Sequence, residues 1–155
     1  MTQLSEDLMP LHLAAEEESH VFSYAKPEKI DASKAMVRLA RSEVLKSWVQ
    51  IVKTHGGENN LHYHRNVDTF WMVLKGRVRF YGPGDEVLGE FGPHEGIITP
   101  QYSRYWFENV GEDELELLQV AAYHGGDQGA RIDVSDQKLD ISTVQRFDAP
   151  PPRGR

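Results

Sequence analysis

Two histidines, His62 and His64, are separated by one residue in the segment His62-Tyr63-His64. Side chains two apart on a β-strand point to the same face, so both imidazoles would reach one point in space. Imidazole is the commonest protein ligand for transition metals, and it also exchanges protons near neutral pH. Because seven histidines in 155 residues produce roughly 0.3 such pairs by chance, the pattern needs support from its surroundings.

The chain around this pair consists of short apolar runs separated by turn signals. We expect strands at 47–53, 61–64, 69–74, 78–81, 86–88, 96–99, 105–109 and 114–123. Short strands at this spacing leave no room for crossover helices and are typical of an antiparallel β-sandwich or barrel. Before them the pattern is ambiguous, because Met36, Ala40 and Val44 recur at helical spacing. The predicted fold class is all-β.

The two ends of the chain differ from this middle part. We expect residues 1–45 to form an N-terminal arm and edge strands, 46–125 the barrel, and 126–155 a polar C-terminal tail. The arm is acidic, and the tail ends in a proline-rich stretch that cannot pair inside a sheet.

Composition narrows the classes of function. A chain of 155 residues suits one domain, and the absence of cysteine excludes disulfide frameworks, thiolate metal sites and cysteine nucleophiles. A formal charge of −7 with dispersed lysine and arginine predicts no nucleic-acid partner. With no apolar run near the roughly 18 to 20 residues of a membrane helix and no signal-peptide pattern, we expect no membrane partner and a cytoplasmic location.

The glycines around the histidine pair add a longer motif. Gly56 lies six residues before His62 and Gly76 lies twelve after His64, which produces the pattern G-x5-H-x-H-x4-T-x6-G. This pattern resembles the first motif of the cupin superfamily, G-x5-H-x-H-x3–4-E-x6-G. The resemblance extends over about 47–123 and implies an RmlC-like double-stranded β-helix, also called a jelly-roll barrel. It also implies a homodimer, because cupins commonly pair through an N-terminal strand or arm.

The second cupin motif, G-x5-P-x-G-x2-H-x3-N, is matched only in part. Pro100 and Asn109 stand at their expected places, whereas Tyr105 occupies the histidine position. In the first motif Thr69 occupies the glutamate position. Two of the four ligands that metal-binding cupins typically use are therefore replaced by hydroxyl groups.

The resemblance implies that His62 and His64 are the metal ligands that remain. Two imidazoles completed by water favour a divalent transition metal over magnesium or calcium, and zinc, nickel, copper, iron and manganese are the candidates. Gln119, His124 or an ionised Tyr105 could supply a third ligand. In the alternative interpretation, the two histidines are hydrogen-bonded pocket residues without a metal.

Asp68 would take the glutamate place in the shorter form of the first motif. A one-residue offset on a strand, however, turns the side chain to the other face, so Asp68 would serve only in a bulged strand. His55, before the glycine turn, is a weaker candidate for a ligand contact. His12, His20 and His94 are expected at the surface.

Strand alternation extends the candidate site beyond the histidines. If Thr69 faces the interior, Trp71 does so as well, and an inward Tyr105 brings Phe107 with it. Together with Gln119 these residues are expected to bind a small organic substrate, with Tyr105 as catalytic proton donor or hydrogen-bond partner. On the following strand, Arg77 and Arg79 share a face that would suit a carboxylate if it pointed inward.

Three functions follow from this candidate site. The first is a metal-dependent enzyme that acts on a small molecule. The second is a metal-free barrel in which His62, His64 and Tyr105 bind a ligand or perform acid–base chemistry. The third is a non-enzymatic sensor or storage protein that uses the same pocket, since one fold hosts many functions.

Overall fold

The computed structural model describes residues 5–125, 130–134 and 143–152, apart from the side chains of residues 58 and 59. Its elements are η1 (Glu6–Leu8), α1 (Met9–Glu18), β1 (Lys34–Arg41), β2 (Leu45–Val52), β3 (Gly57–His64), β4 (Val67–Lys75), β5 (Val78–Tyr81), η2 (Pro83–Asp85), β6 (Val87–Phe91), β7 (Gly96–Thr99), β8 (Tyr105–Asn109), β9 (Leu115–Tyr123), β10 (Arg131–Asp133) and β11 (Val144–Asp148).

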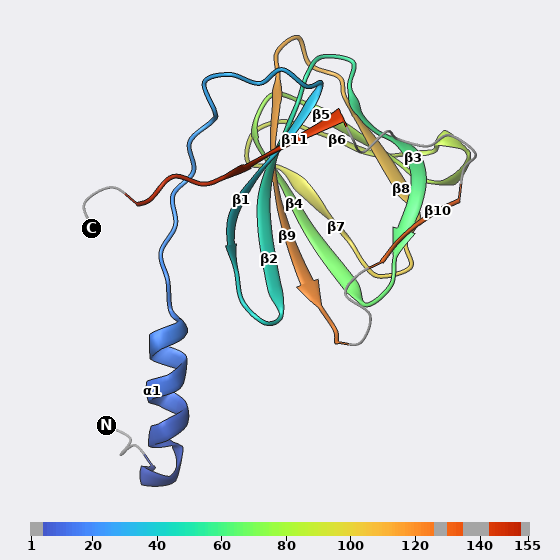
Figure 1. Cartoon of the computed structure of the whole chain (residues 1–155). Coiled ribbons are helices and arrows are strands. Elements are labelled where there is room, and N and C mark those ends of the chain that lie inside the picture. Colours follow the sequence, from blue (N-terminus) through green and yellow to red (C-terminus); the bar gives the residue numbers. More distant parts are fainter. Residues whose placement is uncertain (1–4, 126–129, 135–142, 153–155) are drawn as a thin grey trace.

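These strands form two sheets that face one another as a barrel (Figure 1). One sheet has the strand order β11-β1-β2-β9-β4-β7, and the other has the order β10-β3-β8-β5-β6. Between the described strands every pairing is antiparallel except that of β1 with β11. The predicted all-β, antiparallel barrel is confirmed.

The ambiguous segment before residue 47 is a strand. β1 pairs with β2 from Lys34 opposite Val52 onward, and its residues alternate between the two faces of the sheet. Ala35 and Val37 pack on the outer face, whereas Lys34 and Met36 face the barrel interior. The helical spacing of apolar residues in this segment is therefore misleading, because β1 has apolar residues on both of its faces.

Two short strands come from the segment that the sequence assigns to the tail. β10 pairs with β3, with Arg131 opposite His64, and β11 pairs in parallel with β1, with Arg146 opposite Met36. Residues 131–133 and 144–148 thus extend the two sheets of the barrel. Polar composition hides both strands, since each is at the edge of a sheet.

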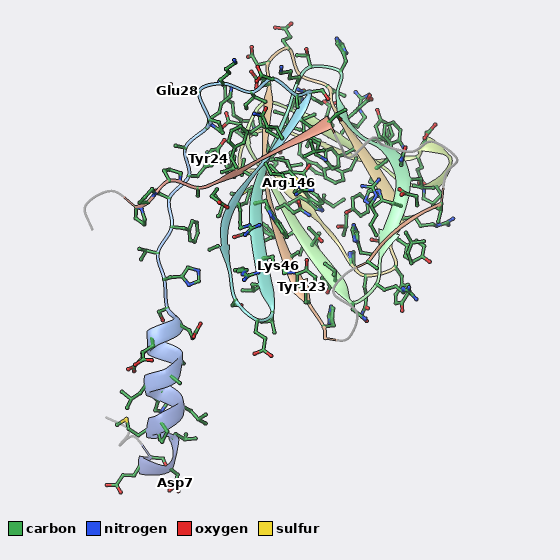
Figure 2. The ribbon with its side chains drawn as sticks, viewed as in Figure 1. Asp7, Tyr24, Glu28, Lys46, Tyr123 and Arg146 are labelled. Carbon is green, nitrogen blue, oxygen red and sulfur yellow. The ribbon has the colours of Figure 1, made fainter. Side chains whose placement is uncertain are left out.

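The N-terminal arm carries the helix α1, which stands away from the barrel in Figure 1. The helix buries none of its residues. Tyr24, labelled in Figure 2, fixes the following extended segment to the outer face of the sheet through a hydrogen bond to Glu116.

In the part of the chain that the structure describes, no helix is long and apolar enough to cross a bilayer. The homodimer stays a prediction.

The barrel interior is apolar at one end. Fully buried side chains there come from four strands, which belong to both sheets, and pack into one cluster: Val52, Val73, Val78, Phe80, Leu115 and Leu117. Further along the same strands, polar side chains replace them. Gln50 follows the inward alternation of Val52 on β2, and Gln119 follows that of Leu117 on β9. β2 and β9 therefore contribute both to the core and to the polar half.

Replacing Leu117 with alanine tests how much the apolar cluster contributes to the free energy of unfolding. Leu117 is fully buried in the apolar cluster, so Leu117→Ala is expected to lower the free energy of unfolding by about 2 to 5 kcal/mol. The exposed Leu88 provides the control, and Leu88→Ala should change it by less than about 1 kcal/mol. Urea unfolding measures both, and equal losses would contradict the assignment of the core.

Candidate functional site

A cavity of about 170 Å³ lies at the polar end of the barrel interior. Side chains from both sheets surround it: Lys34, Met36, Gln50, His62, His64, Trp71, Tyr105, Phe107, Gln119, Arg131, Val144 and Arg146. Arg146, labelled in Figure 2 on β11, is exposed and so stands at the mouth of the cavity.

Aromatic rings separate this cavity from the apolar core. Trp71 packs with its ring centroid 5.4 Å from that of Phe107 and 6.1 Å from that of Tyr105. Phe80 lies behind them, 5.1 Å from Phe107. Tilted and edge-to-face pairs of this kind stabilise a core beyond their buried area and hold the rings in fixed positions. The cavity therefore has a rigid aromatic wall.

His62 is placed by a hydrogen bond that also defines its protonation. Its Nδ1 lies 2.7 Å from the carbonyl oxygen of Asn60, which accepts only, so Nδ1 carries the proton and Nε2 is left as an acceptor. Burial, followed by the positive charge of Arg131, lowers the pKa of His62 to about 3. His62 is thus a neutral imidazole at physiological pH, with its ring centroid 5.3 Å from that of His64.

Tyr105 is a buried phenol beside Trp71. The indole N–H of Trp71 donates to Thr99 Oγ1 over 2.9 Å, which holds the indole in place. Burial raises the pKa of Tyr105 well above its usual value, so the phenol stays protonated and is a poor metal ligand.

The cavity is lined by positive charges. Lys34, Arg131 and Arg146 all contribute to it, and no carboxylate does so among the described residues. Lys34 is 5% exposed, with Nζ 5.6 Å from the centroid of the Phe107 ring. Burial, and then the charges of Arg131 and Arg146, lowers the pKa of Lys34 to about 7. Asp133 lies 3.0 Å from Arg131 and offsets one of these charges.

Two glutamines complete the polar lining. Gln50 Nε2 donates to Gln119 Oε1 over 2.7 Å across β2 and β9. Gln50 is 3% exposed, and its Oε1 has no hydrogen-bond partner within the described part of the chain. A buried amide oxygen without a donor is costly, so this atom needs a donor from beyond the described residues.

The donor set is poor for a divalent metal. Nowhere in residues 5–125, 130–134 and 143–152 do three histidine or acidic side chains come together. His62 and His64 are the only imidazoles among the described residues that line the cavity, and three cationic side chains line it with them. A divalent cation in the cavity would lie beside these like charges. These residues fit a metal ion badly.

Most residues that the sequence assigns to the site meet in this cavity. It brings together His62, His64, Trp71, Tyr105, Phe107 and Gln119. Thr69 faces inward on β4 and is 3% exposed, but it does not line the cavity.

Other candidates lie elsewhere. Asp68 is on the opposite face of β4, where its carboxylate accepts from the Gln101 backbone N–H and lies 3.3 Å from His124. Neither Asp68 nor His124 lines the cavity, and neither does the exposed His55. Arg77 and Arg79 form ion pairs with Glu90, away from the cavity.

Sequence reasoning misses several residues of the cavity, the charged ones above all. Lys34 lies in the segment with misleading helical spacing, and Arg131 and Arg146 lie in the supposed tail. Gln50 alone had a usable signal, since it alternates in phase with Val52 on an expected strand.

Comparison with solved structures gives several similar folds. A protein with a double-stranded beta-helix domain from Klebsiella pneumoniae subsp. pneumoniae is 15% identical, with a TM-score of 0.61, and the match covers 76% of this chain and 99% of that one. An RmlC-like cupin family protein from Methanocaldococcus jannaschii is 19% identical, with a TM-score of 0.55 and coverage of 68% and 92%. An RmlC-like cupin protein from Desulfovibrio desulfuricans is 20% identical, with a TM-score of 0.56 and coverage of 66% and 97%.

These likenesses concern the fold. At such identities they do not extend to ligand or activity, and none of the three descriptions names either. No family model matches the sequence, and no curated protein matches it.

Lys34→Met is expected to raise the free energy of unfolding at about pH 6. At that pH the native wild-type protein must bury a charged ammonium group beside Arg131 and Arg146. His62 and His64, on the facing strand, line the same cavity. Folding lowers the pKa of Lys34 from 10.5 to about 7. The cost is therefore complete below pH 7 and disappears as the pH rises toward 10.5.

The gain of the variant over the wild type should accordingly shrink between about pH 7 and pH 10, by about 1.4 kcal/mol for each unit of pKa difference. Urea unfolding across this range measures it. Lys75→Met, at an exposed position, is the control and should show no such trend. A Lys34→Met protein that is less stable than the wild type at about pH 6 would contradict the burial of a charge.

Proposed function

We propose that this chain, which has the cupin fold, is a small-molecule-binding barrel whose ligand occupies the cavity without a resident metal ion. The observation that carries the proposal is the set of polar groups buried at the hollow end of an otherwise apolar barrel. Lys34, Gln50 and His62 are each 5% exposed or less. Burying polar and charged groups lowers stability unless they are paired. Gln50 Oε1 has no hydrogen-bond partner among the described residues, and a ligand in the cavity would supply one.

The lining has the composition of a ligand site. Aromatic surface from Trp71 and Phe107 provides apolar contact, while imidazole, phenol, amide and cationic groups converge from both sheets. Small-molecule sites typically combine a mostly apolar wall with a few placed polar groups. The cavity of about 170 Å³ is below the roughly 300 Å³ at which pockets for drug-sized molecules begin, so the ligand is small.

A metal-independent enzyme is the second candidate, and one arrangement favours it. The protonated phenol of Tyr105 and the neutral imidazole of His62 lie side by side, with ring centroids 4.5 Å apart. One is a hydrogen-bond donor and the other presents Nε2 as an acceptor, so the two could orient a small substrate. With the pKa of His62 lowered and that of Tyr105 raised, they are a weak base and a weak acid. Tyr105→Phe removes the donor and would abolish turnover while leaving the aromatic wall in place.

An NMR screen of small organic fragments tests whether the cavity binds them. Binding there should shift the indole N–H signal of Trp71 and the backbone signals of His62 and Gln119, because these residues line the cavity. The indole N–H of Trp106 donates to Asp85 on the outer surface, and its signal is the internal control. Hits whose shifts gather elsewhere, or a screen without hits, would contradict the proposal.

Metal titration tests the metal-dependent alternative, which stays a prediction. Because cations line the cavity, zinc, nickel, iron(II) and manganese should not raise the thermal unfolding midpoint of the wild type. Any change that they cause should be the same in His64→Gln. His55→Gln, at an exposed position outside the cavity, is the matched control. A rise that is present in the wild type and His55→Gln but absent in His64→Gln would overturn the metal-free proposal.

A further inference from the structure

We propose that β11 is a movable cover of the cavity, and that residues 24–32 of the N-terminal arm are a strap that holds this cover closed. Release of the strap lets β11 move away from β1 and opens the cavity. Three features carry the proposal: β11 forms part of the cavity wall, it is attached to its sheet on one side, and the strap bonds to its outer face.

The inner face of β11 is part of the cavity wall. Val144 and Arg146 both line the cavity, and Figure 2 labels Arg146 on this strand. In the parallel pairing with β1, Val144 lies opposite Lys34 and Arg146 lies opposite Met36, which are two further lining residues. Movement of β11 away from β1 would therefore open this side of the cavity. Covers of this kind admit a ligand when open and exclude water when closed.

The attachment of β11 to its sheet is one-sided. The strand has five residues, Val144–Asp148, and lies at the edge of the sheet, where β1 is its neighbour among the described strands. Parallel pairs are slightly less stable per residue than antiparallel ones. Local segments with few partners open at a fraction of the free energy of global unfolding. Because β1 is also paired with β2, β11 can detach while β1 stays in the sheet.

The strap contacts the opposite, outer face of β11. Gln145 Oε1 accepts a hydrogen bond from the backbone N–H of Asp31 over 2.9 Å. Phe147 packs against the buried cluster on the outer face of the sheet, and so do Tyr24 and Ile30 of the strap. The strap therefore bonds to β11 directly and shares with it the apolar surface on which both rest.

Side chains attach the strap to the barrel. The hydroxyl of Tyr24 donates to Glu116, and Lys26 Nζ lies 3.3 Å from Glu114 Oε2. The structure describes the whole strap, and none of it is helix or strand. Each of these contacts contributes little to stability by itself. The strap can therefore release β11 without unfolding of the barrel, and its contacts set how often β11 opens.

The reactivity of a thiol placed in the cavity tests whether the strap controls opening. Because the chain has no cysteine, Gln50→Cys introduces a single thiol, at a lining position that is 3% exposed. Its rate of reaction with dithiodipyridine measures access to the cavity. Tyr24→Phe removes the donor to Glu116, and Gln145→Leu removes the acceptor for Asp31. Added to Gln50→Cys, each should raise the rate about three- to tenfold, because one hydrogen bond of the closed state is lost.

Hydrogen exchange measured by NMR shows which part of the protein opens. The backbone amides of β11 should exchange faster in Tyr24→Phe and in Gln145→Leu by about the same factor, whereas those of β9, inside the sheet, should not change. Tyr102→Phe, which removes the hydroxyl of an exposed tyrosine outside the strap, is the matched control and should change neither the exchange nor the thiol reactivity.

Unchanged thiol reactivity in both strap variants would overturn the proposal. So would equally faster exchange in β11 and β9, because the strap would then stabilise the barrel as a whole. Faster exchange of β11 without a change at the thiol would show that β11 does not cover the cavity. The thiol reagent takes the place of a ligand, so the cover is confirmed or refuted whatever the fragment screen finds.

Discussion

The ammonium group of Lys34 lies inside the barrel, and the polar half of the molecule is built around that burial. Transferring a charge from water to a protein interior is costly, and two neighbouring guanidinium groups add repulsion. The rest of the fold must offset this cost in the free energy of folding. The source of that stability is the other end of the same strands, where apolar side chains from both sheets close a fully buried core.

This division along the strands explains how one small barrel contains both a core and a cavity. β2 and β9 contribute Val52 and Leu117 to the core and then, one inward position further on, Gln50 and Gln119 to the cavity. The aromatic rings of Trp71, Tyr105 and Phe107 belong to both parts. Their packing against Phe80 holds the wall of the cavity in place.

Much of the site is predictable from strand alternation, because alternation is a local property. His62 and His64 share a face, and the register that places Thr69 rather than Asp68 inward holds in the structure. The charged part is not predictable in this way. Lys34 reaches the cavity on a strand whose apolar residues have misleading helical spacing. Arg131 and Arg146 reach it on short edge strands of polar composition, whose partners His64 and Met36 are far away in the sequence. Such pairings leave no periodic signal in the sequence.

Direct titration of the Lys34 side chain by NMR tests the burial of this ammonium group most directly. We expect burial and the two arginines to hold the pKa of Lys34 at about 7. A Lys34 pKa at the ordinary lysine value would contradict this, because the ammonium group would then not be buried among like charges.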